Sequence, residues 1–300
     1  MNSIFRHFSP YQPCILLVIV GFMLAQLIMI SKVAVTSGVQ PLELAFISTL
    51  GAGIILIILA AKNAEIPPLS PRHLVLYLVL GCVSFAYPNA VTYFVVDRVG
   101  PAYGSIVYSL SPLITFALAA LIGIEKMTLK RGLGLAIGLI GVALVVWQKT
   151  DVKLNGEYLW ILMGLTVPAS LAIGNVIRTA YWPKGTSALS FASATLLVSA
   201  MLLFVVAIAT EGASTWLVKT PVELKWITVM LVTSAVFYVL IFRLQKIAGP
   251  VYLSQIGYWG TGFGVVLAAL IYGDLVSTLA VGGIALIISG AVLANSKNST

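Results

Sequence analysis

Long runs of apolar residues, separated by short polar stretches, fill the chain almost from end to end. A helix needs about 20 apolar residues to cross the hydrocarbon core of a membrane. Ten runs reach this length, at residues 13–36, 42–61, 73–96, 102–124, 129–147, 158–181, 189–210, 224–242, 251–272 and 278–294. The runs are continuously apolar rather than alternating, which is typical of helices. The pattern therefore predicts an all-α membrane protein with ten transmembrane helices.

The composition agrees with a membrane environment and excludes several kinds of chemistry. Of the 300 residues, 60% are hydrophobic and 9% are charged, whereas a soluble domain carries roughly 25% charged residues. Nine carboxylates, two histidines and two cysteines are too few for a metal cluster or a disulfide framework. We expect Cys14 and Cys82, which lie in apolar runs, to be small buried packing residues. We predict no cofactor and no enzymatic activity.

The distribution of lysine and arginine predicts the orientation in the membrane. With the N-terminus in the cytoplasm, 11 of the 17 lysines and arginines fall on the cytoplasmic side and 6 on the other. This predicts a multi-pass protein of the inner or plasma membrane with both termini cytoplasmic. The net charge of +8 then reflects topology and attraction to anionic lipid, and no nucleic-acid partner is expected.

The two halves of the chain repeat each other when one is shifted by 149 positions. Gly100-Pro101-Ala102-Tyr103 then falls on Gly249-Pro250-Val251-Tyr252, and the glycines 134 and 141 fall on glycines 283 and 290. Ten helices divide into five plus five, and an odd number inverts the second half. We therefore predict a 5+5 inverted-topology repeat, with units at 1–148 and 149–300.

These features resemble the EamA-like branch of the drug/metabolite transporter superfamily. The resemblance rests on the 5+5 plan, the Gly-Pro turns, the acids Glu125 and Asp274 after the fourth and ninth helices, and the glycine-rich fifth and tenth helices. Lys32 and Arg178 match the cations that members tend to carry, whereas Leu24 and Ser170 stand where a tryptophan is usual in the first helix and at its repeat in the sixth. The resemblance implies export or exchange of small metabolites, often amino acids. It also implies a central cavity lined by helices 1, 3, 4, 6, 8 and 9.

Polar side chains in mid-membrane are costly unless they face a cavity or another helix. The third helix carries Tyr87, Asn89 and Tyr93 around Pro88, which predicts either a pathway lining or a kinked packing helix in which Asn89 bonds to a neighbour. The fourth helix offers Tyr108 and Ser109 on one broad face, where the serine also suits close helix packing.

The ninth helix is the strongest candidate for the site, because Gln255, Tyr258 and Trp259 lie near the middle of its span. The glycine pairs 260/264 and 134/138 have the spacing of helix-packing seams. Weaker candidates are Gln26 in the first helix, Asn175 in the sixth and Tyr238 in the eighth. Lys32 is expected to snorkel to the interface, or else to act at a gate or on a substrate carboxylate, and Arg178 to be a topology charge.

The predicted function is a secondary carrier for amino acids or related zwitterions, working by alternating access as an exporter or facilitated carrier. The carboxylates lie in loops or near helix ends, which favours transport without obligatory proton coupling. Aromatic side chains also suit quaternary amines, and a lipid-like substrate or a non-transporting scaffold stays open. The expected partners are a small-molecule substrate and membrane lipids, with the protein a monomer or weak homodimer.

Overall fold

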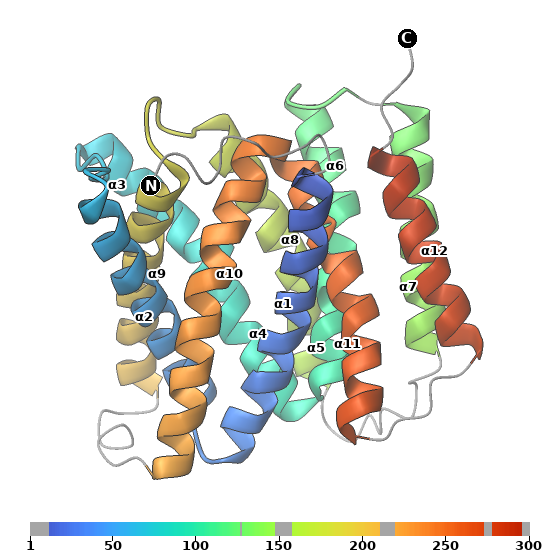
Figure 1. The fold of residues 1–300 in the computed structure, drawn as a ribbon, viewed down its shortest axis with the longest axis horizontal. Coiled ribbons are helices and arrows are strands. Elements are labelled where there is room, and N and C mark those ends of the chain that lie inside the picture. The colour runs from blue at the N-terminus through green and yellow to red at the C-terminus, as the bar shows by residue number, and fades with distance from the viewer. Residues whose placement is uncertain (1–11, 127, 148–157, 211–219, 273–277, 296–300) are drawn as a thin grey trace.

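The computed structural model describes residues 12–126, 128–147, 158–210, 220–272 and 278–295. Every regular element within these ranges is helical (Figure 1). In chain order they are α1 (Gln12–Thr36), α2 (Pro41–Lys62), α3 (Pro71–Gly81), η1 (Cys82–Ala86), α4 (Tyr87–Arg98), α5 (Pro101–Val107), η2 (Tyr108–Leu110), α6 (Ser111–Leu121), α7 (Leu129–Trp147), α8 (Tyr158–Ala180), α9 (Ala188–Thr210), α10 (Pro221–Ser254), α11 (Ile256–Tyr272) and α12 (Thr278–Asn295). The predicted all-helical fold is confirmed.

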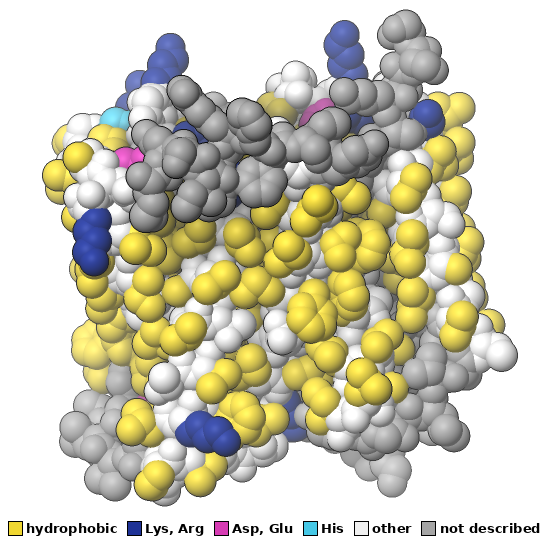
Figure 2. Space-filling model, viewed as in Figure 1, with side chains coloured by type: hydrophobic (Ala, Val, Ile, Leu, Met, Phe, Trp, Pro, Cys, Tyr) yellow, Lys and Arg dark blue, Asp and Glu magenta, His cyan; other side chains and the backbone are white. Residues whose placement is uncertain are grey.

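Seven helical runs are long and apolar enough to cross a membrane. These candidate spans are Gln12–Thr36, Pro41–Lys62, Pro71–Arg98, Tyr103–Leu121, Tyr158–Ala180, Ala188–Thr210 and Pro221–Ser254. Ile256–Ile271 and Val281–Ala294 are shorter apolar helices. On the face shown in Figure 2, hydrophobic side chains cover the middle, and the visible lysines and arginines gather toward the two ends. The structure is thus that of a multi-pass membrane protein, and the count of ten spans stays a prediction.

The helices form one bundle with a pair at each edge. At one edge α7 packs along α12, and at the other α2 packs along α9, with α3 beside α9 (Figure 1). Between them, α1 packs against α10 and α11, and α8 packs against α4 and α6. The beginning of α1 and the end of α12 lie at the same side of the bundle. The centre is therefore enclosed by helices from both halves of the chain.

The α7 and α12 helices approach each other through glycines. A Cβ added to Gly134 would lie 2.5 Å from the nitrogen of Ala294 and 2.8 Å from the oxygen of Gly290. A Cβ added to Gly141 would lie 2.5 Å from the oxygen of Gly283. Backbones this close leave no room for a side chain. We call this contact, made by glycines 134, 138, 141, 283 and 290, the glycine seam.

The end of the eighth predicted helix differs from the expected boundary. The apolar run stops at residue 242, but the helix continues through Arg243 and Gln245 to Gly249, where φ is 81° and ψ is −179°. The chain changes direction there, and Pro250 starts the next helical piece. Gly100, at the repeat-related position before Pro101, also has a positive φ of 116°. Both turns use glycine because an L side chain is strained at such a φ.

Of two further predictions, the one for the glycine pair 260/264 is confirmed and the one for the two cysteines is wrong. Gly260 packs against the side chain of Leu24 and Gly264 against that of Ser105, so the predicted packing role of this pair is confirmed. Cys14 and Cys82 are unpaired and exposed on the outside of the bundle. The prediction that both are buried is wrong, because each lies on the outer side of its helix, where an apolar run faces the surroundings rather than a neighbour.

Candidate functional site

A cavity with about 790 Å³ of space free of protein atoms, its opening included, lies between the halves of the chain. Its lining comes from α1, η1, α4, η2, α6, α8, α10 and α11. These elements correspond to the first, third, fourth, sixth, eighth and ninth predicted helices, which are the six that the family resemblance implied.

A π-helix brings Ser84 and Phe85 into the cavity wall. Pro88 has no N–H and crowds the carbonyl one turn before it, and the five residues Cys82–Ala86 widen into η1 directly ahead of it. Ser170 of α8 donates a hydrogen bond of 2.6 Å to the carbonyl of Val83, so a neighbouring helix satisfies this irregular backbone. Both Ser84 and Phe85 line the cavity.

A second proline shapes the opposite wall. Pro112 of α6 follows the short 3-10 turn η2, and the carbonyl of Tyr108 lies four residues before it. A Cβ added to Gly257 of α11 would lie 2.1 Å from that carbonyl oxygen. Only a glycine permits this approach. The contact fixes the backbone of Tyr108, whose side chain lines the cavity, as does that of Ser111.

Arg178 of α8 is the charged side chain in the lining. It is 2% exposed, and its guanidinium lies against a stacked pair of rings, 5.1 Å from the centre of Phe85 and 4.7 Å from that of Phe242. Its Nη1 donates to Oε1 of Gln245 over 2.6 Å, whereas Nε has no hydrogen-bond partner. In the part of the chain that the structure describes, no carboxylate forms an ion pair with Arg178.

Gln245 of α10 holds the guanidinium from one side. Its Nε2 donates to the carbonyl of Asn175 over 2.7 Å and to Oγ1 of Thr179 over 2.9 Å. With both amide hydrogens used on α8, the amide oxygen faces Arg178. The side chain is 2% exposed, so its orientation is fixed by buried contacts.

The remaining polar lining is neutral and largely bonded to itself. Asn89 of α4 donates to the hydroxyl of Tyr238 of α10 over 2.8 Å, and the hydroxyls of Thr92 and Tyr108 lie 3.0 Å apart. Leucines, isoleucines and Phe237 form the apolar part of the wall. The cavity therefore combines one cation, several satisfied hydroxyls and an apolar body.

Five of the predicted site residues lie together in this lining. They are Asn89, Tyr93, Tyr108, Asn175 and Tyr238, and they come from α4, η2, α8 and α10. Asn89 also makes the cross-helix bond that the packing alternative described. Asn89 thus both lines the cavity and bonds to a neighbouring helix, so the two predicted roles are compatible.

The other six predicted site residues do not line the cavity. Tyr258 is 0% exposed, lies against Gly138 and donates 2.7 Å to the carbonyl of Leu135 of α7. Trp259 packs on Gly21 and stacks on Phe263, and the Tyr87 hydroxyl bonds to Thr166. Gln26 lies on α1 outside the lining, and Ser109 and Gln255 are buried elsewhere in the bundle.

Sequence reasoning missed the charge of the cavity. Arg178 was expected to be a topology charge, whereas its side chain lines the cavity. The signal was present, since Asn175 and Arg178 are spaced to share a helix face. Lys32, the other matched cation, lies outside the lining, and its Nζ donates to the carbonyl of Asp97 over 3.2 Å.

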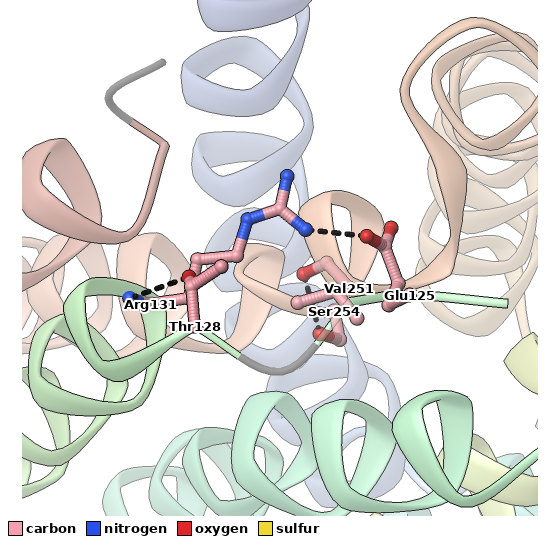
Figure 3. Close-up of polar contacts among 5 residues, drawn as sticks. All are labelled: Glu125, Thr128, Arg131, Val251 and Ser254. Carbon is pink, nitrogen blue, oxygen red and sulfur yellow. Dashed lines mark hydrogen bonds and ion pairs between the residues drawn. The ribbon is translucent and has the colours of Figure 1, made fainter. Parts of the chain in front are cut away.

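The acid that follows α6 lies outside this lining. Glu125 forms an ion pair with Arg131, which lies at the start of α7 (Figure 3). The backbone N–H of Arg131 also donates a hydrogen bond of 3.4 Å to Oγ1 of Thr128. Ser254, which lines the cavity, donates 2.8 Å to the carbonyl of Val251. Asp274, the repeat partner of Glu125, falls outside the described residues. Among the described residues, no three His, Cys, Asp or Glu side chains form a group that could hold a metal ion.

Comparisons with known proteins support this description. Residues 12–147 match the EamA-like transporter family. The "Uncharacterized transporter YyaM" of Bacillus subtilis (strain 168) is 30% identical over 167 residues, which are 54% of this chain and 53% of that protein. The match thus spans about half the length of this relative. A protein crystal structure aligns over 96% of this chain and 98% of its own, with a TM-score of 0.73 and 17% identity, and shows likeness of fold alone.

Fold and cavity together define a class, the multi-pass helical membrane proteins with a polar cavity enclosed by both halves of the chain. Within that class, residues 12–147 are similar to the EamA-like transporter family. The resemblance inferred from the Gly-Pro turns and the glycine-rich helices is confirmed.

Proposed function

We propose that the protein is a secondary transporter that moves small metabolites, amino acids or related zwitterions, across the inner or plasma membrane by alternating access. The observation that carries the proposal is the cavity itself, which has polar side chains from both halves in the middle of an apolar bundle. Polar groups at that depth are costly, and a pathway for polar solutes accounts for them. The transporter family of residues 12–147 supports the same function.

The 5+5 inverted repeat is part of this proposal, and several contacts support it. In the glycine seam, Gly134 faces Gly290 and Gly141 faces Gly283. A shift of 149 positions converts each of these pairs into the other. The bonded residues Asn89 and Tyr238 are themselves 149 positions apart. Such self-complementary contacts are expected around a two-fold axis.

The lining also supports transport without obligatory proton coupling. Among the described lining residues there is no Asp, Glu or His, and these side chains are the usual proton relays within membranes. We propose facilitated diffusion or exchange. The alternatives are a quaternary-amine or lipid-like substrate and a scaffold that transports nothing, and both predict no flux of zwitterions.

The test is a thermal-shift screen of the purified protein in detergent, with amino acids, polyamines, quaternary amines and nucleosides, followed by flux into liposomes. A ligand of the folded state raises its apparent stability. We expect a zwitterion to bind and its flux to ignore an imposed pH gradient. Flux that acidifies or alkalinises the liposome lumen in proportion to transport would overturn the uncoupled mechanism.

A pair of variants on one helix connects flux to the cavity. Ile241→Trp fills the lining of α10 and should abolish flux. Val236→Trp adds the same side chain at a position of α10 that is 48% exposed on the outside, and it should leave flux unchanged. Equal flux through both variants would place the pathway elsewhere.

A further inference from the structure

The wall formed by α8 and η1 holds two buried hydrogen-bond donors without partners. One is Nε of Arg178 and the other is the hydroxyl of Ser84, which is 3% exposed. Both residues line the cavity. Buried donors are almost always paired in native structures, so two unpaired donors in one cavity wall need an explanation.

These two donors lie along a single helix contact. The Ser84 hydroxyl lies against Gly174 of α8, where an added Cβ would be 2.0 Å from Oγ. Phe85, the next residue of η1, packs against the guanidinium of Arg178. Gly174 and Arg178 are four residues apart and so share one face of α8. Ser84 and Arg178 thus follow each other along the same contact between α8 and η1.

The contacts of Arg178 position the guanidinium but leave its charge unbalanced. Phe85 and Phe242 lie close to it, and Gln245 occupies one of its five N–H groups with a neutral acceptor. A desolvated charge is costly without a counter-charge. Within the described lining no carboxylate offers one. A ligand with a planar pair of negatively charged oxygens matches this fork of donors.

From these observations we propose that Arg178 and Ser84 form a carboxylate subsite, and that the carboxylate is the group by which the transporter recognises its substrate. This rests on the proposed transport function and deepens it. The described lining has no anion for an ammonium group, so the amine of an amino acid is not required. The substrate class is that of small monocarboxylates with an apolar body, which Leu27, Ile28 and Phe237 accommodate.

Gln245 acts as a positioning residue in this subsite. Because its amide hydrogens are bonded to α8, its oxygen holds Arg178 without neutralising it. Replacing the amide with a carboxylate, as in Gln245→Glu, would supply a resident anion that competes with the substrate.

The experiment compares acids with amides of the same body, which keep the ammonium group but have no carboxylate. Binding to the purified protein is measured for L-leucine, 4-methylpentanoate and L-leucinamide, and for L-phenylalanine, 3-phenylpropanoate and L-phenylalaninamide. We expect the two acids of at least one series to bind with similar affinity, and the amide to bind about 10- to 100-fold more weakly, as expected for loss of a charge-assisted hydrogen bond.

The variants test the assignment to Arg178. Arg178→Gln should weaken acid binding by about 10- to 100-fold and should not weaken binding of the amides, which carry an ammonium group and no carboxylate. Arg178→Lys should restore part of the loss, because it keeps the charge without the planar fork. Gln245→Glu should weaken acid binding although Arg178 is present. Lys32→Gln is the matched control outside the lining and should bind as the original protein does.

Each outcome decides between the two proposals. If amides bind as tightly as acids, or if Arg178→Gln binds acids unchanged, the subsite is wrong while the transport function stands. If no compound of the panel binds and none enters liposomes, the subsite fails together with the transport proposal. The acid and amide comparison uses the unaltered protein, so it remains decisive even where a variant does not fold.

Discussion

The glycine seam and the cavity wall are both contacts between the two halves, but they are built in opposite ways. Along the seam, backbones of α7 and α12 meet where an added Cβ would lie 2.5 Å from a neighbouring atom. Along the wall of α8 and η1, two buried donors have no partner. Close packing stabilises a bundle in lipid, whereas unpaired donors destabilise it. We infer that the seam serves folding and that the wall serves binding, so substitutions in the two regions should separate these properties.

The largest effect is expected in the seam. Gly290→Ala would place a Cβ 2.5 Å from the oxygen of Gly134 and 2.5 Å from the nitrogen of Gly138. We expect the free energy of unfolding to fall by about 3 kcal/mol, at the upper end for overpacking. Thermal unfolding in detergent measures it. Gly282→Ala on the same helix meets nothing within 4 Å, and a similar loss there would contradict the packing explanation.

A smaller loss is expected where the seam meets α11. Tyr258→Phe removes the hydroxyl that donates to the carbonyl of Leu135 and should lower the free energy of unfolding by about 1.5 kcal/mol. Binding of the acid panel should not change, because Tyr258 is outside the lining. Tyr238→Phe is the matched change inside it. If Tyr258→Phe alters acid affinity as much as Tyr238→Phe does, the separation of the two regions is wrong.

At the cavity wall we expect a substitution to raise the free energy of unfolding rather than to lower it. Arg178→Met removes a buried charge, and in the absence of ligand we expect the free energy of unfolding to rise by about 1 kcal/mol, because an apolar side chain avoids the cost of desolvation. Thermal unfolding without ligand measures this. Arg72→Met changes an exposed arginine at the start of α3 and serves as the control. A large fall in stability for Arg178→Met would mean that Arg178 is a structural residue.

The smallest effect on stability is expected for Lys32, the cation of the first predicted helix. Lys32 is half-buried and bonds to the carbonyl of Asp97, so Lys32→Gln should change the free energy of unfolding by less than about 0.5 kcal/mol. A flux assay with an acid that binds should show an unchanged apparent affinity. A loss comparable to that of Arg178→Gln would assign Lys32 to the pathway as well.

The apolar runs predicted most helix boundaries because the length of a membrane helix is set by the bilayer. Residues 158–181 were expected as a helix and Tyr158–Ala180 is one. The eighth helix extends past its apolar run because backbone hydrogen bonding continues through the polar residues up to Gly249. Pro88 predicted an irregular third helix but not its form, the π-helix η1, whose backbone accepts a hydrogen bond from Ser170 of another helix.

The site was predicted only in part, because polarity indicates that a side chain is inside the bundle but not which neighbour it faces. Gly257 and Tyr258 are adjacent in α11, yet Gly257 lines the cavity and Tyr258 faces α7. Successive helical residues point about 100° apart, and the rotation of the helix is set by packing. Arg178 was missed because its place near a helix end suggested an interface, whereas the side chain is buried against Phe85 and Phe242.

The hydrogen bond between Asn89 and Tyr238 has an evolutionary consequence. In the proposed repeat these residues occupy equivalent positions. An ancestor assembled from two identical subunits would have set the same side chain against itself there. Once the halves were joined in one chain, each position was free to change separately, and a dedicated donor could meet a dedicated acceptor. The same freedom allows Arg178 to line one wall of the cavity while the described residues of the opposite wall include no equivalent cation. Fusion of the halves thereby permits a polar ligand to be held in one orientation.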